Sequence, residues 1–131
     1  MEAKDLRIGN IIECDNIEYN VWDISGGYVG LDSAVKDHHT TKCLDKINPI
    51  PLTDKHLDRL GFKSNGDEDD EEWYCISQPH FALFLGLDGT WKMIFDTYFI
   101  DIEIKYVNQL QNIFYFLENE ELVLNTQAGR V

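Results

Sequence analysis

The fold of this chain is decided by the segment IIECDNIEYNVWDI, residues 11–24, in which an Asp-Asn pair separates two apolar runs. Both residues of the pair at 15–16 tolerate the positive φ that a type I′ turn requires, so the segment predicts a β-hairpin. The second run alternates apolar and polar residues as far as Val21, after which the apolar phase moves to Trp22 and Ile24. Such a change of phase predicts a bulge, or a bend that carries the strand from one sheet to another.

Further short strands follow the hairpin. A Gly-Gly turn leads to a predicted strand at 28–32 with Val29 and Leu31 facing inward. Residues 33–42 are expected to form a polar loop, and residues 42–47 a weaker fourth strand. Several short and strongly bent strands in so short a segment predict an SH3-like barrel or a curled sheet.

A capped helix is predicted at residues 52–62, after a Pro-Ile-Pro break. Thr53 suits the N-cap, and Leu52 can pack onto Leu57 as a hydrophobic staple. Gly61 is placed where a left-handed residue ends a helix.

The second half predicts an antiparallel meander with strands at 73–77, 80–87, 91–95 and 99–106. The Asp-Gly pair at 88–89 lies between apolar runs and is typical of a hairpin turn. Residues 81–87 are apolar on both faces, so this strand is expected in the middle of a covered sheet.

An amphipathic helix is predicted at 108–117 and is expected to cover the meander. One helical face carries the apolar residues Leu110, Ile113, Phe114 and Leu117. Asn108 and Gln111 fit a capping box, and Asn119 suits a left-handed stop. A last edge strand is predicted at 122–124.

Together these elements predict an α+β fold in one domain with two sub-layers. Residues 1–50 would form the SH3-like curled sheet, and residues 51–131 the short helix, the antiparallel meander and the C-terminal helix.

The chain is acidic, with 24 Asp and Glu against 11 Lys and Arg in 131 residues, a formal net charge of −13. This balance argues against binding to nucleic acid or to an anionic membrane, because both are gripped by basic surfaces. Six carboxylates form one uninterrupted run: Asp67, Glu68, Asp69, Asp70, Glu71 and Glu72. The run predicts a solvated loop that is either a solubilising hairpin tip or a docking surface, for a basic partner or for an enzyme that normally holds phosphate. Its spacing is not that of an EF-hand calcium loop.

The charged N-terminus lacks the apolar stretch of a signal peptide, and no segment has the length of a membrane span. Three scattered cysteines indicate reduced thiols, at least two of them in the core. We therefore expect a cytoplasmic protein.

No catalytic, metal-binding or cofactor-binding site is predicted. A zinc set would have to be assembled from Cys14, Cys43, Cys75, His38, His39, His56 and His80, which lack a closely spaced cysteine pair. Pairing Cys43 or Cys75 with His80 as nucleophile and base is conceivable but unspecific. No P-loop, dinucleotide fingerprint or nucleophile elbow occurs.

Three stretches of the chain resemble a family of small proteins that is common in prophages and mobile elements of Bacteroidota. They are residues 6–10 (LRIGN), 49–53 with 60–62 (PIPLT, LGF), and 104–112 with 120–122 (IKYVNQLQN, EEL). The family pattern has a histidine where this chain has Asn108, so no role for a histidine is carried over. The resemblance implies a setting, the cytosol of a phage-infected or lysogenic bacterium, and no activity.

The leading functional hypothesis is a non-enzymatic accessory protein that binds a host or phage protein, such as a defence enzyme that it blocks. Its binding residues would be the acidic run or the polar side of the last helix, formed by Tyr106, Asn108, Gln109 and Asn112. The alternative is a nucleotide-type ligand held by Lys92 and Lys105, and an enzyme is a third. The edge strand at 122–124 could also pair two copies into a homodimer.

Overall fold

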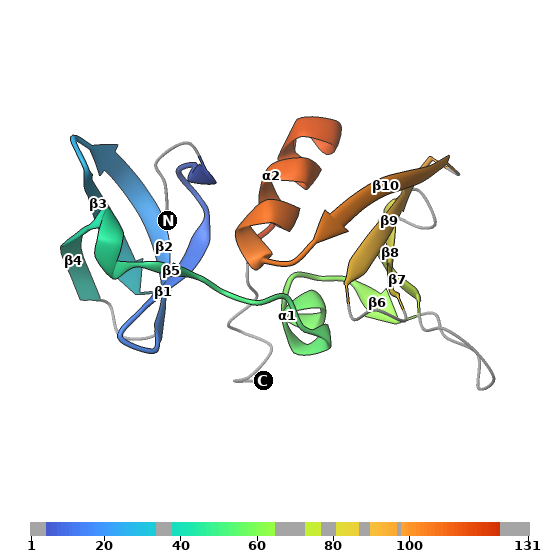
Figure 1. Cartoon of the computed structure of the whole chain (residues 1–131), viewed down its shortest axis with the longest axis horizontal. Helices are drawn as coiled ribbons and strands as arrows, with labels where there is room; N and C mark the ends of the chain where they lie inside the picture. The colour runs from blue at the N-terminus through green and yellow to red at the C-terminus, as the bar shows by residue number, and fades with distance from the viewer. Residues whose placement is uncertain are drawn as a thin grey trace. The chain divides into compact units, whose positions relative to one another are not determined.

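A computed structural model describes residues 5–33, 38–64, 73–76, 81–86, 90–96 and 98–123. The chain divides into two compact units (Figure 1): Met1–Pro51 together with Tyr106–Val131 form the first, and Leu52–Lys105 the second. Among the described residues, each unit has one five-stranded antiparallel sheet and one α-helix. The predicted α+β class is therefore confirmed.

The sheet of the first unit has the strand order β4-β3-β2-β1-β5. Its strands are β1 (Ile11–Cys14), β2 (Ile17–Ser25), β3 (Tyr28–Ser33), β4 (His38–Cys43) and β5 (Asn48–Pro49), and a 3-10 turn, η2 (Leu44–Lys46), precedes β5. The first four strands form a meander, and β5 returns to pair with β1.

Two-residue turns with positive φ close the first two hairpins. Asp15 and Asn16 have φ of 52° and 64°, which confirms the predicted type I′ geometry. Gly26 and Gly27, with φ of 53° and 86°, close the hairpin between β2 and β3 in the same way.

The predicted bulge lies at Trp22. Val21 pairs with Leu31 and Asp23 with Gly30, so Trp22 is the extra residue on β2, which stays within one sheet. The change of phase had suggested that the Trp22 side chain faces inward. It is instead 54% exposed. The indole covers Gly30, where a Cβ atom would lie 2.8 Å from Trp22 Cε2, so a larger residue there would force the ring to move.

The loop predicted at 33–42 and the strand predicted at 42–47 are wrong in part. Strand β4 covers His38–Cys43 and pairs with β3 over its whole length, and the chain then turns into η2. The polar residues of this segment suggested a loop, but β4 is an edge strand, where polar side chains and β-branched Thr are well tolerated.

A hydrophobic cluster of the first unit gathers alternate residues of its strands. Its buried residues are Leu6, Ile12, Cys14, Tyr19, Val21, Val29, Leu31 and Ile47. Val29 and Leu31 face inward as their alternation predicts, and both are fully buried.

Helix α2 (Val107–Glu118) begins earlier than the sequence suggested. Tyr106 is the N-cap, and its N–H donates to Gln109 Oε1 at 3.0 Å. The predicted capping box of Asn108 and Gln111 is wrong. Both residues follow the first residue of the helix, and their side chains bind other segments of the chain.

The helix ends as predicted at Asn119, which has φ 58° and donates its N–H to Tyr115 O at 2.8 Å. The residues that follow, 121–123, form no strand, so the predicted edge strand is wrong over its described part. Leu122 is nevertheless buried, at 3% exposure. The burial of Leu122, and the hydrogen bond from Gln111 Nε2 to its carbonyl, hold this segment to the unit without a strand ladder.

Helix α1 (Asp54–Arg59) of the second unit has both predicted caps. Thr53 Oγ1 accepts the N–H of His56 at 3.3 Å. At the other end, the N–H of Phe62 donates to Leu57 O at 2.9 Å and that of Gly61, with φ 98°, to Asp58 O at 3.1 Å. These two bonds make a complete Schellman motif.

The second sheet has the order β10-β9-β8-β7-β6 (Figure 1). Its strands are β6 (Lys63–Ser64), β7 (Trp73–Ile76), β8 (Phe81–Leu85), β9 (Trp91–Phe95) and β10 (Tyr98–Ile104). The apolar strand β8 lies in the middle, as predicted. Phe81 is fully buried, with its ring 6.1 Å from the rings of both Phe62 and Phe95. An aromatic cluster thus joins the sheet to the turn after α1.

The sequence predicted that α2 accompanies the meander. The observed division into units instead groups the helix with the first sheet. Of the predicted apolar face, Leu110 and Phe114 are buried, Ile113 is half-buried and Leu117 is 36% exposed. Apolar spacing shows which face of a helix is buried, but it does not show which sheet the helix accompanies.

Candidate functional site

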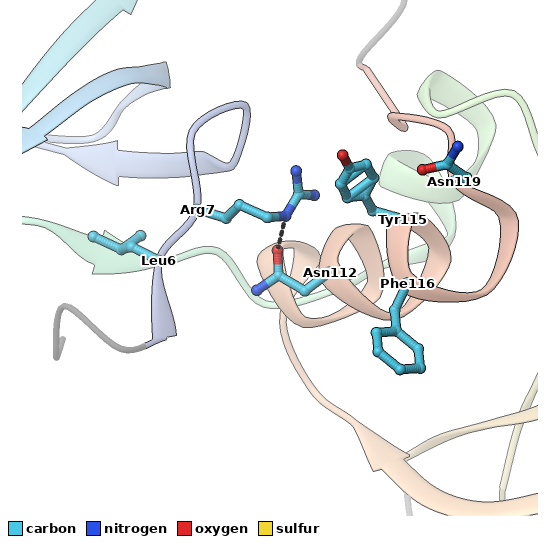
Figure 2. Close-up of a pocket in the computed structure, with 6 residues that line it drawn as sticks. All are labelled: Leu6, Arg7, Asn112, Tyr115, Phe116 and Asn119. Carbon is cyan, nitrogen blue, oxygen red and sulfur yellow. Dashed lines mark hydrogen bonds between the residues drawn. The ribbon is translucent and has the colours of Figure 1, made fainter.

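Arg7 lies at the centre of a polar contact between the segment before β1 and helix α2 (Figure 2). Its Nε donates to Asn112 Oδ1 at 3.1 Å, and its Nη1 to Glu121 Oε2 at 2.6 Å. The guanidinium carbon also lies 4.3 Å from the centre of the Tyr115 ring. This combination of a fork of hydrogen bonds with a cation–π contact is one that only arginine supplies.

Gln111 is fully buried beside this contact and binds three backbone groups. Its Oε1 accepts the N–H of Ile11 at 2.8 Å, and its Nε2 donates to Gly9 O at 3.0 Å and to Leu122 O at 2.8 Å. One carboxamide therefore satisfies the start of β1 and the segment after α2 at once.

The neighbouring asparagines have similar roles. Asn108 is 4% exposed and donates to Asp5 O at 3.1 Å, while Asn112 Oδ1 accepts Asn10 Nδ2 at 2.8 Å. Gln109 is bound at the N-cap. The polar side of α2, which the sequence predicted as a binding edge, therefore makes most of its hydrogen bonds within the unit. These residues hold the helix to the chain before β1.

A hollow of about 560 Å³ opens beside Arg7 (Figure 2). It is lined by Leu6, Arg7, Asn112, Tyr115, Phe116 and Asn119. Figure 2 shows Tyr115 beside the guanidinium and Phe116 directed away from it; Phe116 is 87% exposed. Arg7, the cation in this lining, is already paired with Glu121.

The two lysines that the sequence proposed as ligand contacts lie together in the second unit. Lys92 Nζ is 3.9 Å from Glu103 Oε1, and Lys105 Nζ is 3.9 Å from Glu103 Oε2. The carboxylate between them balances part of their charge, so a phosphate bound there would compete with Glu103.

The acidic run 67–72 lies outside the described residues, as does His80, the proposed base of the Cys/His pairs. Of the cysteines, Cys14 is buried, Cys75 half-buried and Cys43 exposed. Burial raises the pKa of the Cys14 thiol, with a further contribution from Asp15, and burial also raises that of Cys75. Both thiols are thereby made poorer nucleophiles. Across the part of the chain that the structure describes, no three His, Cys, Asp or Glu side chains gather as a metal site would need.

Strand β10 is the most distinctive surface feature of the second unit. Three of its large side chains are exposed: Tyr98 at 71%, Phe99 at 56% and Ile102 at 40%. Among the described strands β10 pairs only with β9, so its other edge has no neighbour, and its register shifts between Ile100 and Ile104. The sequence predicted this strand but could not identify it as an edge, because edge position depends on which other strands pair.

No helix in the described ranges is long and apolar enough to cross a membrane. Comparison of the chain with protein-family models, with curated proteins and with solved structures finds no match.

Proposed function

We propose that this protein acts by binding another protein, without catalysis, and that β10 is part of the binding surface. The observation that carries the proposal is the exposure of Tyr98, Phe99 and Ile102 on one strand whose outer edge has no neighbour among the described strands. Aromatic residues are enriched at protein–protein interfaces.

The proposed setting is the bacterial cytosol, where the protein would be an accessory factor of a prophage or mobile element. The resemblance of residues 6–10, 49–53 and 104–112 to such proteins supports this setting. A host or phage protein, such as a defence enzyme, is the proposed partner. We also propose that the first sheet is SH3-like, which is supported by the return of β5 to β1 after a 3-10 turn. That fold supports many functions and does not select among them.

Site-specific photo-crosslinking tests the proposal. A photoreactive phenylalanine analogue at Phe99 is expected to yield a discrete protein adduct in a Bacteroidota lysate, because the side chain is exposed on the proposed surface. The same analogue at Tyr28, which is 54% exposed in the first unit, is the matched control. The Ile102→Asp variant should lose the adduct. Equal labelling at both positions, or none at Phe99, would contradict protein binding through β10.

A second candidate is a nucleotide-type ligand, favoured by the convergence of Lys92 and Lys105 on Glu103. A ligand present at about 100 times its Kd is expected to add about 2.7 kcal/mol to the free energy of unfolding. Thermal unfolding in the presence of nucleoside mono-, di- and triphosphates measures this gain. The Lys92→Gln variant is the control, since it should lose the gain, and the absence of any shift in the wild-type chain would exclude the candidate.

A further inference from the structure

We propose that β10 binds its partner by strand addition, and that the partner contributes an extended segment in which apolar residues alternate with Lys or Arg. This inference rests on the proposed protein-binding function and adds the mode of binding and the chemistry of the partner.

The backbone of β10 supports strand addition. The strand has seven residues, and β9 is its one neighbour among the described strands, so a row of N–H and C=O groups lies along its outer edge. Just past the strand, Lys105 O accepts the N–H of Leu52 at 2.9 Å, which limits the open edge to Tyr98–Ile104. At about 3.3 Å per residue, an edge of this length matches one added strand of ordinary size.

The side chains of β10 offer apolar contacts to an added strand. Phe99 pairs with Ile94, and its ring lies 6.0 Å from that of Phe84, so these groups share one face of the sheet. Tyr98 projects to the other face, since successive residues of a strand alternate. In strand addition the main chain supplies affinity and pockets for alternate side chains supply specificity. An apolar side chain on either face of the added strand would therefore meet an aromatic neighbour.

Charge selects the partner. Asp101 is exposed on β10 and has no ion pair with any described residue. Glu103 is also exposed, but it lies 3.9 Å from both Lys92 and Lys105, so Asp101 is the carboxylate of β10 that is open to a partner. Opposite charges on neighbouring strands are favourable, whereas like charges are not. A basic residue opposite Asp101 is therefore favoured, while a second copy of the chain, with a net charge of −13, is disfavoured.

The opposite interpretation is that the two carboxylates and the shifted register only protect an exposed edge from pairing. That interpretation predicts no affinity for an extended peptide of any charge. The two interpretations can therefore be separated with synthetic peptides and the full chain.

The test is fluorescence anisotropy of labelled peptides of about nine residues, which cover the edge of seven residues with about one residue to spare at each end. A peptide alternating Val and Lys is expected to bind, and one alternating Val and Glu to bind at least about tenfold more weakly, because like charges face each other. Two N-methylated forms of the basic peptide extend the test, each with the backbone N–H groups along one of its two edges blocked. Their affinities should differ, because binding is lost in the form whose blocked edge faces β10.

Two variants locate the interaction on the protein. Asp101→Lys should weaken binding of the basic peptide and strengthen that of the acidic one. Thr41→Lys, on the edge strand β4 of the first sheet, is the matched control and should change neither. The N-methylated peptides keep the test valid even if a variant of β10 fails to fold, because they leave the protein unchanged.

Failure of the inference is distinguishable from failure of the proposed function. Equal binding of the two N-methylated peptides, equal binding of acidic and basic peptides, or no binding at all would overturn strand addition by a basic segment. Concentration-dependent dimerisation that Asp101→Lys alters would also overturn it, in favour of a second copy. A crosslink from Phe99 together with any of these results would leave protein binding in place and exclude only the proposed mode.

Discussion

Replacing Gln111 with Ala is expected to lower the free energy of unfolding by about 3–5 kcal/mol, as measured by urea denaturation followed by circular dichroism. The variant removes the carboxamide that binds the N–H of Ile11 and the carbonyls of Gly9 and Leu122. All three backbone groups lose their partner at a fully buried position. Each unsatisfied group costs about 1–3 kcal/mol, and partial entry of water keeps the total below the sum.

Gln109→Ala is the matched control on the same helix. Gln109 caps the N–H of Tyr106 and is only half-buried, so its loss is expected to cost about 1 kcal/mol. A loss at Gln111 no larger than the loss at Gln109 would show that the buried carboxamide does not hold β1, α2 and the segment after it together.

Local signals in the sequence predicted the local structure well. The Asp-Asn turn at 15–16, the Thr53 cap and the Asn119 stop each depend on a few neighbouring residues, and each is confirmed. Two errors concern elements whose local signals pointed elsewhere. Strand β4 exists because β3 is available to pair with it, although its residues are polar. The helix start is a capping box of Tyr106 and Gln109, whereas the sequence pattern had favoured Asn108 and Gln111.

The polar contact around Arg7 could not be found from periodicity. Gln111 lies next to Leu110, where the helical pattern predicts a polar residue at the edge of the apolar face. It is nevertheless fully buried, and its carboxamide binds the N–H of Ile11 and the carbonyl of Gly9. The one sequence signal was the resemblance, which grouped residues 6–10, 104–112 and 120–122. The structure brings these stretches into contact within the first unit, so packing accounts for them, and the candidate binding surface lies elsewhere, on β10.

Replacing Phe81 with Ala is expected to lower the free energy of unfolding by about 3–5 kcal/mol. The side chain is fully buried in the middle strand of the second sheet, between the rings of Phe62 and Phe95. Its removal forfeits apolar burial, two edge-to-face ring contacts and the packing that joins β8 to the turn after α1, and it leaves a cavity that a rigid sheet cannot close. Urea denaturation of the variant measures the loss.

Phe116→Ala deletes the same ring from a position that is 87% exposed, and is expected to change stability by no more than about 0.5 kcal/mol. The pair therefore separates burial from side-chain type. A comparable loss at both positions would mean that Phe116 is covered in solution, as it would be if α2 formed an interface. A small loss at Phe81 would mean that β8 is not the centre of a packed sheet. In that case the edge position of β10, from which the proposed binding surface follows, would fail as well.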